Sequence, residues 1–286
     1  MLVHVKTILK DAAVKDYAVG AFSTTNLEMT LGIVRAAVAV KSPVIIQISE
    51  AAIKYAGLAP LVNLVQHVAQ GEGGPVPVAL HLEHGRSFGS VSAAVEANFS
   101  SVMINQAELP FDENVILTKK SVDFAHKHDV WAQGQLGVIP GGEGENNVPS
   151  RKAELTSPKL AAEFVEQTKV DGLSVSFGNV RGLDKLKQQP DLDFDLLKAI
   201  GDAVSVPLVL QGASLMKDKL IEQSVSRGIK IVSYNTDLRR AFAKALQSSV
   251  ANKNNIDTRE ILRPAITAVE RVVSDKLKLL GSESKA

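Results

Sequence analysis

The chain has 286 residues, of which 45% are hydrophobic and 22% are charged, and this is the composition of an ordinary globular protein with a sizeable core. Its 32 basic and 31 acidic residues give a formal net charge of +1, so charge provides no argument for nucleic acid or an anionic membrane as a partner. The sequence has no cysteine, which excludes disulfides and thiolate metal sites and leaves His, Asp and Glu as possible metal ligands.

The N-terminus, Met-Leu-Val-His-Val-Lys, lacks the basic segment and apolar core of a signal peptide. No window approaches the ~18 uninterrupted apolar residues of a membrane-spanning helix. We therefore expect a cytoplasmic, enzyme-sized protein. The length is compatible with one large α/β barrel or with two medium domains, and the order of the elements must decide between them.

Apolar runs alternate with helix-period segments along the whole chain. A short amphipathic helix within residues 1–16 precedes the first run. Each of the eight runs that follow is typical of a buried parallel strand, because its apolar residues are nearly continuous. The predicted strands are Tyr17–Ser23, Pro43–Ser49, Pro77–Gly85, Ser101–Asn105, Val130–Leu136, Gly172–Phe177, Pro207–Gln211 and Ile229–Asn235.

Helical periodicity fills most of the connections between these runs. One connection, Gly137–Leu155, is instead predicted as a long loop, because it is rich in glycine, proline and asparagine. Another, Val180–Asp191, is basic and polar. The predicted helices cover residues 27–38, Glu50–Gln70, Ser87–Asn98, Asp112–His126, Thr156–Thr168 with Thr156 as N-cap, Phe194–Ala203, Lys217–Arg227, Thr236–Ala251 and Thr258–Leu280.

Eight alternating units predict a closed (β/α)8 TIM barrel, whose functional site lies where the strands end. No linker or change in composition indicates a second domain, so we expect residues 1–286 to form a single barrel with a C-terminal helical extension. A doubly wound open sheet is the structural alternative, but no Gly-x-Gly-x-x-Gly follows a predicted strand.

The run Pro77–Gly85 ends in three ionisable side chains, His81, Glu83 and His84. By itself this run is equally compatible with a core histidine and a salt-bridged glutamate. Polar residues, however, occur at nearly every predicted strand end, and this distribution favours one shared pocket over scattered helix caps. The polar strand ends are Ser23, Ser49, Glu83, His84, Asn105, Gln135, Asn179–Gly182, Gln211–Ser214 and Ser233–Asp237.

The late strands end in an arrangement suited to an anion. Gly182, Gly212-Ala-Ser214 and Asn235-Thr236-Asp237 offer small residues, hydroxyls and backbone N–H groups, and Lys185 could add a positive charge. Barrels of this kind commonly bind phosphate here, because glycine permits close approach and helix N-termini favour negative charge. The alternative is that the glycines only form turns and that Asn235 and Thr236 only cap a helix.

Two further groups are candidates for chemistry. Arg181 places a cation next to Gly182, in a loop suited to approaching a ligand, although arginines at strand ends are more often solvent-facing. Glu143 and Glu145 lie in the long glycine-rich loop, from which a mobile acid could enter a closed site, or where they could be ordinary solvated charges.

Several ordered motifs across the whole chain resemble the class II, metal-dependent ketose-bisphosphate aldolases, the family of fructose- and tagatose-bisphosphate aldolases. Pro77–Gly85 is similar to the family block Pro-Val-x-Leu-His-Leu-Asp-His-Gly. The other matching blocks are Ala21-Phe-Ser-Thr-Thr-Asn-Leu-Glu28, Lys41–Ser49, Ile53–Gly57, Leu109–Asn114, Gly212–Ser214, Thr236–Arg239 and Leu279–Ala286.

The resemblance implies a barrel, usually dimeric, that reversibly cleaves a ketose bisphosphate into dihydroxyacetone phosphate and an aldehyde. It implies a zinc ion that polarises the ketone, an aspartate at the scissile bond and a glutamate on a mobile loop. Glu83 stands at the place of the aspartate, and Glu143 is the candidate for the glutamate. The phosphate site is largely intact through Gly182, Lys185, Gly212, Ser214 and Thr236, with Asn235 an altered member, and Ser23, Ser49 and Ser233 are further candidates for binding the substrate.

The resemblance also identifies departures at the metal site. Only His84 remains of the family's metal ligands, because Arg181 and Gln211 stand at the places of two histidines and Gln135 at that of a carboxylate. Catalytic zinc normally has three protein ligands, and a guanidinium would repel the ion. We therefore predict no cofactor. The family aspartate is replaced by Glu83, and other polar positions are changed to Asn105, Ser233 and Asn235.

Three functions follow from this comparison. The first is a homologue that binds a sugar phosphate or triose phosphate and has lost or altered aldol cleavage, as a homodimer or together with an intact aldolase. The second is a metal-independent aldehyde-lyase or isomerase that uses Arg181 as electrophile and Glu83 as proton donor or base. The third is a working zinc aldolase with His81, Glu83 and His84 as a rearranged ligand set.

Overall fold

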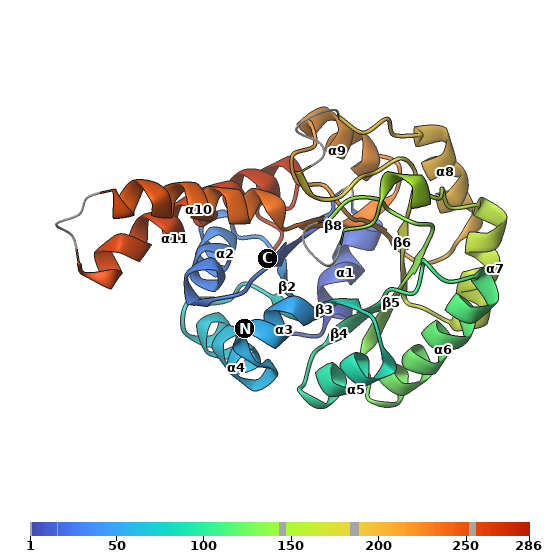
Figure 1. The fold of residues 1–286 in the computed structure, drawn as a ribbon, viewed down its shortest axis with the longest axis horizontal. Helices are drawn as coiled ribbons and strands as arrows, with labels where there is room; N and C mark the ends of the chain where they lie inside the picture. The colour runs from blue at the N-terminus through green and yellow to red at the C-terminus, as the bar shows by residue number, and fades with distance from the viewer. Residues whose placement is uncertain (1, 16, 143–146, 184–188, 252–255) are drawn as a thin grey trace.

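In the computed structural model, described for residues 2–15, 17–142, 147–183, 189–251 and 256–286, eight parallel strands close into a barrel surrounded by helices (Figure 1). Each strand pairs with its neighbours in the sequence, and β1 closes the barrel against β8. This confirms the predicted (β/α)8 fold. The strands are β1 (Val19–Ser23), β2 (Val44–Ser49), β3 (Val78–Gly85), β4 (Ser101–Ile104), β5 (Trp131–Leu136), β6 (Gly172–Val175), β7 (Leu208–Leu210) and β8 (Ile229–Tyr234).

The helices follow the predicted order. None in the described ranges is long and apolar enough to cross a lipid bilayer. They are α1 (Val5–Val14), α2 (Leu27–Val40), α3 (Glu50–Ala56), α4 (Leu58–Gly71), α5 (Phe88–Glu96), α6 (Phe111–Lys127), the short 3-10 turn η2 (Ser150–Lys152), α7 (Pro158–Thr168), α8 (Phe194–Ala203), α9 (Asp218–Val225), α10 (Thr236–Val250) and α11 (Thr258–Leu279).

Two helix predictions were wrong in detail. The segment predicted as one helix over Glu50–Gln70 is divided into α3 and α4 by Gly57, whose φ of 87° is a left-handed conformation that ends α3. The N-cap of α7 is Ser157, whose side chain accepts from the Leu160 N–H, and not Thr156. The Thr156 hydroxyl instead donates to the Leu136 carbonyl and accepts from the Ser176 N–H, so it joins β5 to β6.

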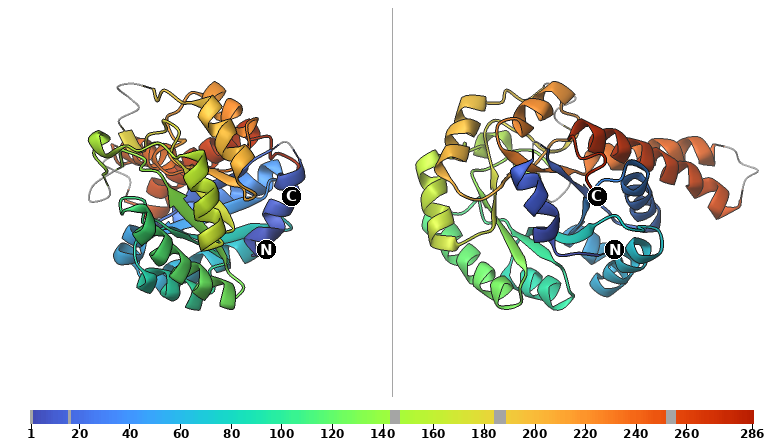
Figure 2. Two further views of the ribbon diagram at one scale, coloured as in Figure 1. Left: turned by 90° about the vertical axis from the view of Figure 1, so that its right-hand side faces the viewer. Right: turned by 180° about the vertical axis from the view of Figure 1, so that it is seen from behind.

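The apolar residues form two separate cores. The larger one lies between the outer face of the barrel and the surrounding helices. The smaller one lies inside the barrel, where Val5, Ile8 and Leu9 of α1 pack against inward-facing side chains such as Ile45 and Trp131. Helix α1 thus closes the N-terminal end of the barrel, and Figure 2 shows it across that end. The opposite end, where the strands finish, is left for a site.

The last two helices, α10 and α11, run side by side and project beyond the barrel wall (Figures 1 and 2). Helix α11 also packs along α2, where Gly32 allows a close approach. A Cβ atom added to Gly32 would lie 2.8 Å from Cβ of Val269 and 3.0 Å from the carbonyl oxygen of Ile266. Both neighbours belong to α11, so the spacing of the two helices depends on the missing side chain.

We predict that Gly32→Ala lowers the stability by about 1–3 kcal/mol, because the helices must separate to admit the methyl group. Such a change lowers the midpoint of thermal unfolding by about 2–4 °C per kcal/mol, which circular dichroism can measure. Gly71→Ala is the matched control, since nothing lies within 4 Å of the added Cβ at the end of α4. An equal midpoint for the two variants would contradict the close packing of α2 on α11.

Candidate functional site

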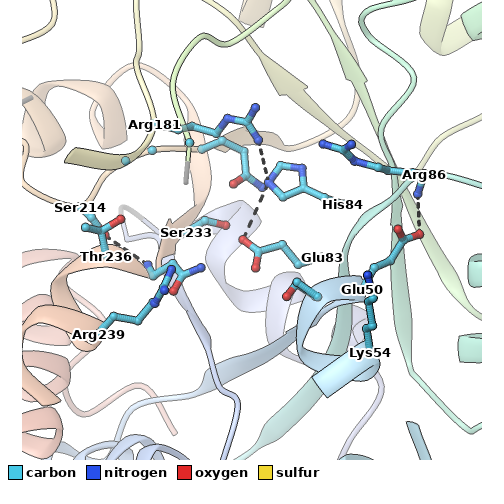
Figure 3. Close-up of a pocket in the computed structure, with 17 residues that line it drawn as sticks. Glu50, Lys54, Glu83, His84, Arg86, Arg181, Ser214, Ser233, Thr236 and Arg239 are labelled. Atoms are coloured by element: carbon cyan, nitrogen blue, oxygen red, sulfur yellow. Dashed lines mark hydrogen bonds and ion pairs between the residues drawn. The ribbon is translucent and has the colours of Figure 1, made fainter. Parts of the chain in front are cut away.

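A cavity of about 590 Å³ opens at the carboxyl ends of the strands (Figure 3). Its lining comes from the ends of β2, β3, β7 and β8, from the loops after β5 and β6, from α3 and from the first turn of α10. A site built from many strand ends is what the polar pattern in the sequence predicted. The lining residues are Ser49, Glu50, Ala51, Lys54, Glu83, His84, Arg86, Gly142, Arg181, Gly182, Gln211, Gly212, Ser214, Ser233, Asn235, Thr236 and Arg239.

Glu83 lies at the centre of this cavity. It is the sixth residue of β3, pairs in register with Ser49 of β2, and is 5% exposed. The Ser23 hydroxyl donates to its Oε2 at 2.9 Å. Burial raises the pKa of Glu83, while the Ser23 hydrogen bond and the positive charge of Arg181 act in the opposite direction. The Ser23 hydroxyl therefore holds the carboxyl group of Glu83 in place.

His84 follows at a distortion of the strand. Its φ is 51°, and the register between β3 and β4 shifts between Leu82 and Gly85, so the ring turns out of the sheet toward the cavity. Burial lowers the pKa of His84 well below its usual value, and the charges of Arg181 and Arg86 lower it further. The imidazole is therefore neutral.

Each nitrogen of this neutral ring faces a hydrogen-bond donor. The Asn105 amide oxygen accepts from the Ala107 N–H at 3.4 Å, which leaves the amide nitrogen facing Nδ1 of His84 at 3.0 Å. Nη1 of Arg181 faces the other ring nitrogen, Nε2, at 3.4 Å, and a neutral imidazole accepts at only one of its nitrogens, so the ring can satisfy only one of these two donors. Nε2 lies 3.9 Å from Oε1 of Glu83.

Arg181 is fixed by its backbone. Its N–H donates to the Pro140 carbonyl at 2.8 Å, and residues 141 and 181 form a parallel β-bridge. A side chain on Gly141 would overlap the Arg181 carbonyl, and one on Gly212 would overlap the Val180 carbonyl, so both glycines are needed for this close approach. The loop after β6 is therefore clamped between two neighbouring segments.

The Arg181 guanidinium lies over His84 (Figure 3), with Nη1 3.4 Å from Nε2 of the ring. Its Nε is buried without a hydrogen-bond partner. Burial lowers the pKa of Arg181, and the nearby carboxylate of Glu83 acts against that shift. The residue therefore brings a positive charge to the middle of the cavity, and removing this charge from water costs free energy.

At another side of the cavity, Ser214 lies at the N-terminus of α10 (Figure 3). Its Oγ accepts from the backbone N–H groups of Asn235 and Asp237, at 3.2 and 3.3 Å. Two N–H groups thus use both lone pairs of the oxygen, so its own proton points to a different partner. Ser214 is 3% exposed and lines the cavity, where this O–H can be donated to a ligand.

Charged residues that the sequence did not identify complete the lining. Arg86 follows β3, and its backbone N–H donates to Oε1 of Glu50 at 2.8 Å. Lys54 enters from α3, and Arg239 from the first turn of α10. The sequence signal that could have identified Arg86 is its position two residues after His84. Lys54 follows Ser49 by five residues on a predicted helix, and Arg239 belongs to a motif already matched to the family.

Most of the predicted site residues meet in this cavity. Ser23 does not line it, because its hydroxyl is beneath Glu83. Gln135 does not line it either, because its amide nitrogen donates to the Gly137 carbonyl at 3.3 Å inside the barrel. Glu143 and Lys185, like Glu145, lie outside the described residues. The predicted residues in the lining are Ser49, Glu83, His84, Arg181, Gly182, Gln211, Gly212, Ser214, Ser233, Asn235 and Thr236.

His81 lies deeper in the barrel than Glu83 and does not line the cavity. It is 3% exposed, its Nδ1 is 2.9 Å from the Ser101 hydroxyl, and its Nε2 has no hydrogen-bond partner. Burial lowers the pKa of His81 to about 3. It is a neutral histidine of the barrel interior.

The side chains around His84 do not match the ligand set of a catalytic zinc. Within the described ranges, no group of three or more His, Asp or Glu side chains is arranged to hold a metal ion. The nearest neighbours of the imidazole are one carboxylate, one neutral amide and the guanidinium of Arg181. Zinc needs imidazole, thiolate or carboxylate donors, and a cation 3.4 Å from the one histidine opposes its binding.

Comparisons with known proteins agree on one family. The family model "Fructose-bisphosphate aldolase class-II" matches residues 3–285. A fructose-bisphosphate aldolase of Helicobacter pylori is 38% identical, with all of both chains covered. One of Geobacillus stearothermophilus is 37% identical, over 100% of this chain and 99% of the relative.

Solved structures show the same relationship. The YdjI aldolase of Escherichia coli K12 has a TM-score of 0.84 and 33% identity, with all of both chains covered. A putative fructose-1,6-bisphosphate aldolase of Coccidioides immitis has a TM-score of 0.90 and 26% identity, over 99% of this chain and 97% of the other. The likeness therefore extends over the whole barrel.

The buried state of His81 leads to a prediction about pH. Unfolding allows this ring to take up a proton between pH 6.5, its unfolded pKa, and about pH 3. The stability that it confers is complete above pH 6.5 and is lost as the pH falls, by about 1.4 kcal/mol per pH unit. We expect the free energy of unfolding of His81→Gln, measured with urea between pH 6.5 and 4, to fall by about 1.4 kcal/mol per pH unit less than that of the wild type.

The matched control for this experiment is Gln47→Leu, which also changes a buried polar side chain of the barrel interior but has no titrating group. Its free energy of unfolding should depend on pH as in the wild type. An unchanged slope for His81→Gln would mean that His81 is protonated in the folded barrel.

Proposed function

The chain belongs to the class II fructose-bisphosphate aldolase family, and on this premise we propose that its cavity binds a phosphorylated sugar or triose phosphate. The observation that carries this proposal is the donor arrangement at Ser214, where a buried hydroxyl at the start of α10 points its proton away from two backbone N–H groups. The N–H groups of the first helical turn form the positive end of the helix dipole, and this end of a helix stabilises an anion.

Three further features support a phosphate at the end of the cavity where Ser214 lies. Gly182 and Gly212 have φ values of 70° and 81° and leave the backbone bare on the cavity side. Thr236 adds a second hydroxyl, and Arg239 a cation. Among the charged residues described in the lining, Lys54, Arg86, Arg181 and Arg239 outnumber the acids Glu50 and Glu83 by four to two, which favours an anionic ligand.

For the chemistry, we propose that this protein lacks the catalytic zinc of its family and that aldol cleavage is lost or altered. The support is the donor set, in which His84 faces a guanidinium in place of further imidazoles. Gln211, at the place of a family histidine, would offer a metal only a neutral amide.

The adjacency of Arg181, His84 and Glu83 favours a second candidate, a metal-independent lyase or isomerase acting on a phosphosugar. The Arg181 guanidinium would stabilise negative charge on the oxygen of a ketone as it becomes an enediolate. Glu83, whose pKa is raised by burial, would hold or return the proton at the neighbouring carbon. The Ser23 hydroxyl would fix the orientation of that carboxyl group.

The phosphate site is tested by Ser214→Asp. A carboxylate can accept from the N–H groups of Asn235 and Asp237 as the hydroxyl does, so the fold should persist, but its charge repels phosphate. We expect the Kd for dihydroxyacetone phosphate, measured by isothermal titration calorimetry, to rise at least ~10-fold. Ser214→Thr is the control and should retain most of the affinity. Equal Kd values for Ser214→Asp and the wild type would refute this site.

The proposed loss of the zinc is tested on the purified protein. We expect elemental analysis to give much less than one zinc per chain, and we expect a chelator to leave any cleavage of fructose bisphosphate unchanged. Stoichiometric zinc together with chelator-sensitive cleavage would refute both metal-free functions. Chelator-resistant cleavage that Arg181→Ala abolishes would favour the lyase over a purely binding role.

A further inference from the structure

We propose that Arg181, His84 and Gln211 form a carboxylate subsite in the middle of the cavity, and that the ligand is a short phosphorylated hydroxy acid. The inference rests on the proposed function for one part only, the phosphate at Ser214. The carboxylate part is argued from contacts that do not involve the phosphate end.

The first observation is the convergence of two donors. Nη1 of Arg181 lies 3.4 Å from Nε2 of His84, and the amide nitrogen of Asn105 lies 3.0 Å from Nδ1 of the same ring. A neutral imidazole accepts at only one nitrogen, so the ring can satisfy only one of these two donors. An oxygen atom that carries negative charge, placed beside Nη1 of Arg181, would accept from the guanidinium in place of the ring. The pair is therefore suited to an anion.

The second observation is the absence of a counter-ion. In the described part of the chain, no carboxylate lies within 4.0 Å of the Arg181 guanidinium, and Nε of that group is buried without a partner. The nearest acid in the cavity, Glu83, is already bonded to Ser23. A largely buried charge is costly, so a ligand that brings a negative charge beside the guanidinium is stabilised by the removal of part of that cost.

The third observation concerns Gln211, which lines the cavity and is 2% exposed. Its Nε2 has Sδ of Met103, 3.7 Å away, as its hydrogen-bond partner, and a thioether sulfur is a weak acceptor. Ser233 lies beside it in the lining, and its Oγ accepts from Nε2 of Gln47 at 3.0 Å, so its proton is directed elsewhere. Both groups can donate to a ligand oxygen.

These donors favour a carboxylate over a neutral carbonyl. A guanidinium presents parallel N–H groups that match the two oxygens of a carboxylate, and hydrogen bonds between ions are about twice as strong as those between neutral groups. The subsite and Ser214 line the same cavity on different sides (Figure 3). A molecule with a phosphate and a carboxylate a few carbon atoms apart would therefore engage both ends.

The test compares four phosphate esters by isothermal titration calorimetry, with a chelator present so that no metal contributes. Two have a carboxylate, 2-phosphoglycolate and 3-phosphoglycerate, and two do not, glycerol 3-phosphate and dihydroxyacetone phosphate. We expect the better of the two acids to bind at least ~10-fold more tightly than either ester without a carboxylate, a difference of about 1.4 kcal/mol.

Arg181→Met should remove this preference, because it weakens the binding of the two acids more than the binding of glycerol 3-phosphate. Arg181→Lys keeps the charge without the planar fork and should retain part of the preference. Arg263→Met changes an arginine whose side chain is 69% exposed, outside the cavity, and is the control with an unchanged preference. If Arg181→Met does not fold, Gln211→Leu gives the same readout.

The outcomes separate the two proposals. Equal binding of the acids and of the esters without a carboxylate would overturn the carboxylate subsite and leave the phosphate site intact. So would a preference for the acids that survives both Arg181→Met and Gln211→Leu. No binding of any of the four esters would overturn both. Tight binding of the acids that depends on Arg181, with weaker binding of the esters without a carboxylate, would support both proposals.

Discussion

The backbone contact between residues 140–142 and 180–182 determines the character of the cavity, because it fixes where the guanidinium of Arg181 lies. The hydrogen bond to the Pro140 carbonyl and the glycines on either side hold the loop with little freedom. From this position the positive charge contributes to the neutrality of His84 and moderates the effect of burial on the Glu83 carboxyl. A relaxed loop would release the charge into water, and the cavity would lose its central cation.

Around that cation, the described polar groups add little negative charge. Gln211 in the lining is a neutral amide, as are Gln135 inside the barrel and Asn105, whose amide nitrogen lies 3.0 Å from Nδ1 of His84. On another side of the cavity, Ser214 is bonded to the first turn of α10. These contacts are the physical basis of the proposed anion site.

The sequence predicted the barrel because buried parallel strands appear as apolar runs, and eight such runs alternate with helices. It did not reveal that Gly57 divides a helix, since one glycine in a periodic segment does not identify its φ. Strand ends indicated which residues meet, yet not the direction of their bonds: Ser23 donates to Glu83 from below, and Gln135 is retained inside the barrel. Arg86, Lys54 and Arg239 were missed because only residues at the strand ends were considered, and these long side chains reach the cavity from positions further along the chain.

Helix α1 determines from which side the cavity can be reached. Its apolar residues fill the N-terminal end of the barrel, so, in the part of the chain that the structure describes, the cavity lies on the side where the strands finish. A ligand that enters from that side would also have to leave from it, so substrate and product would share one face of the molecule.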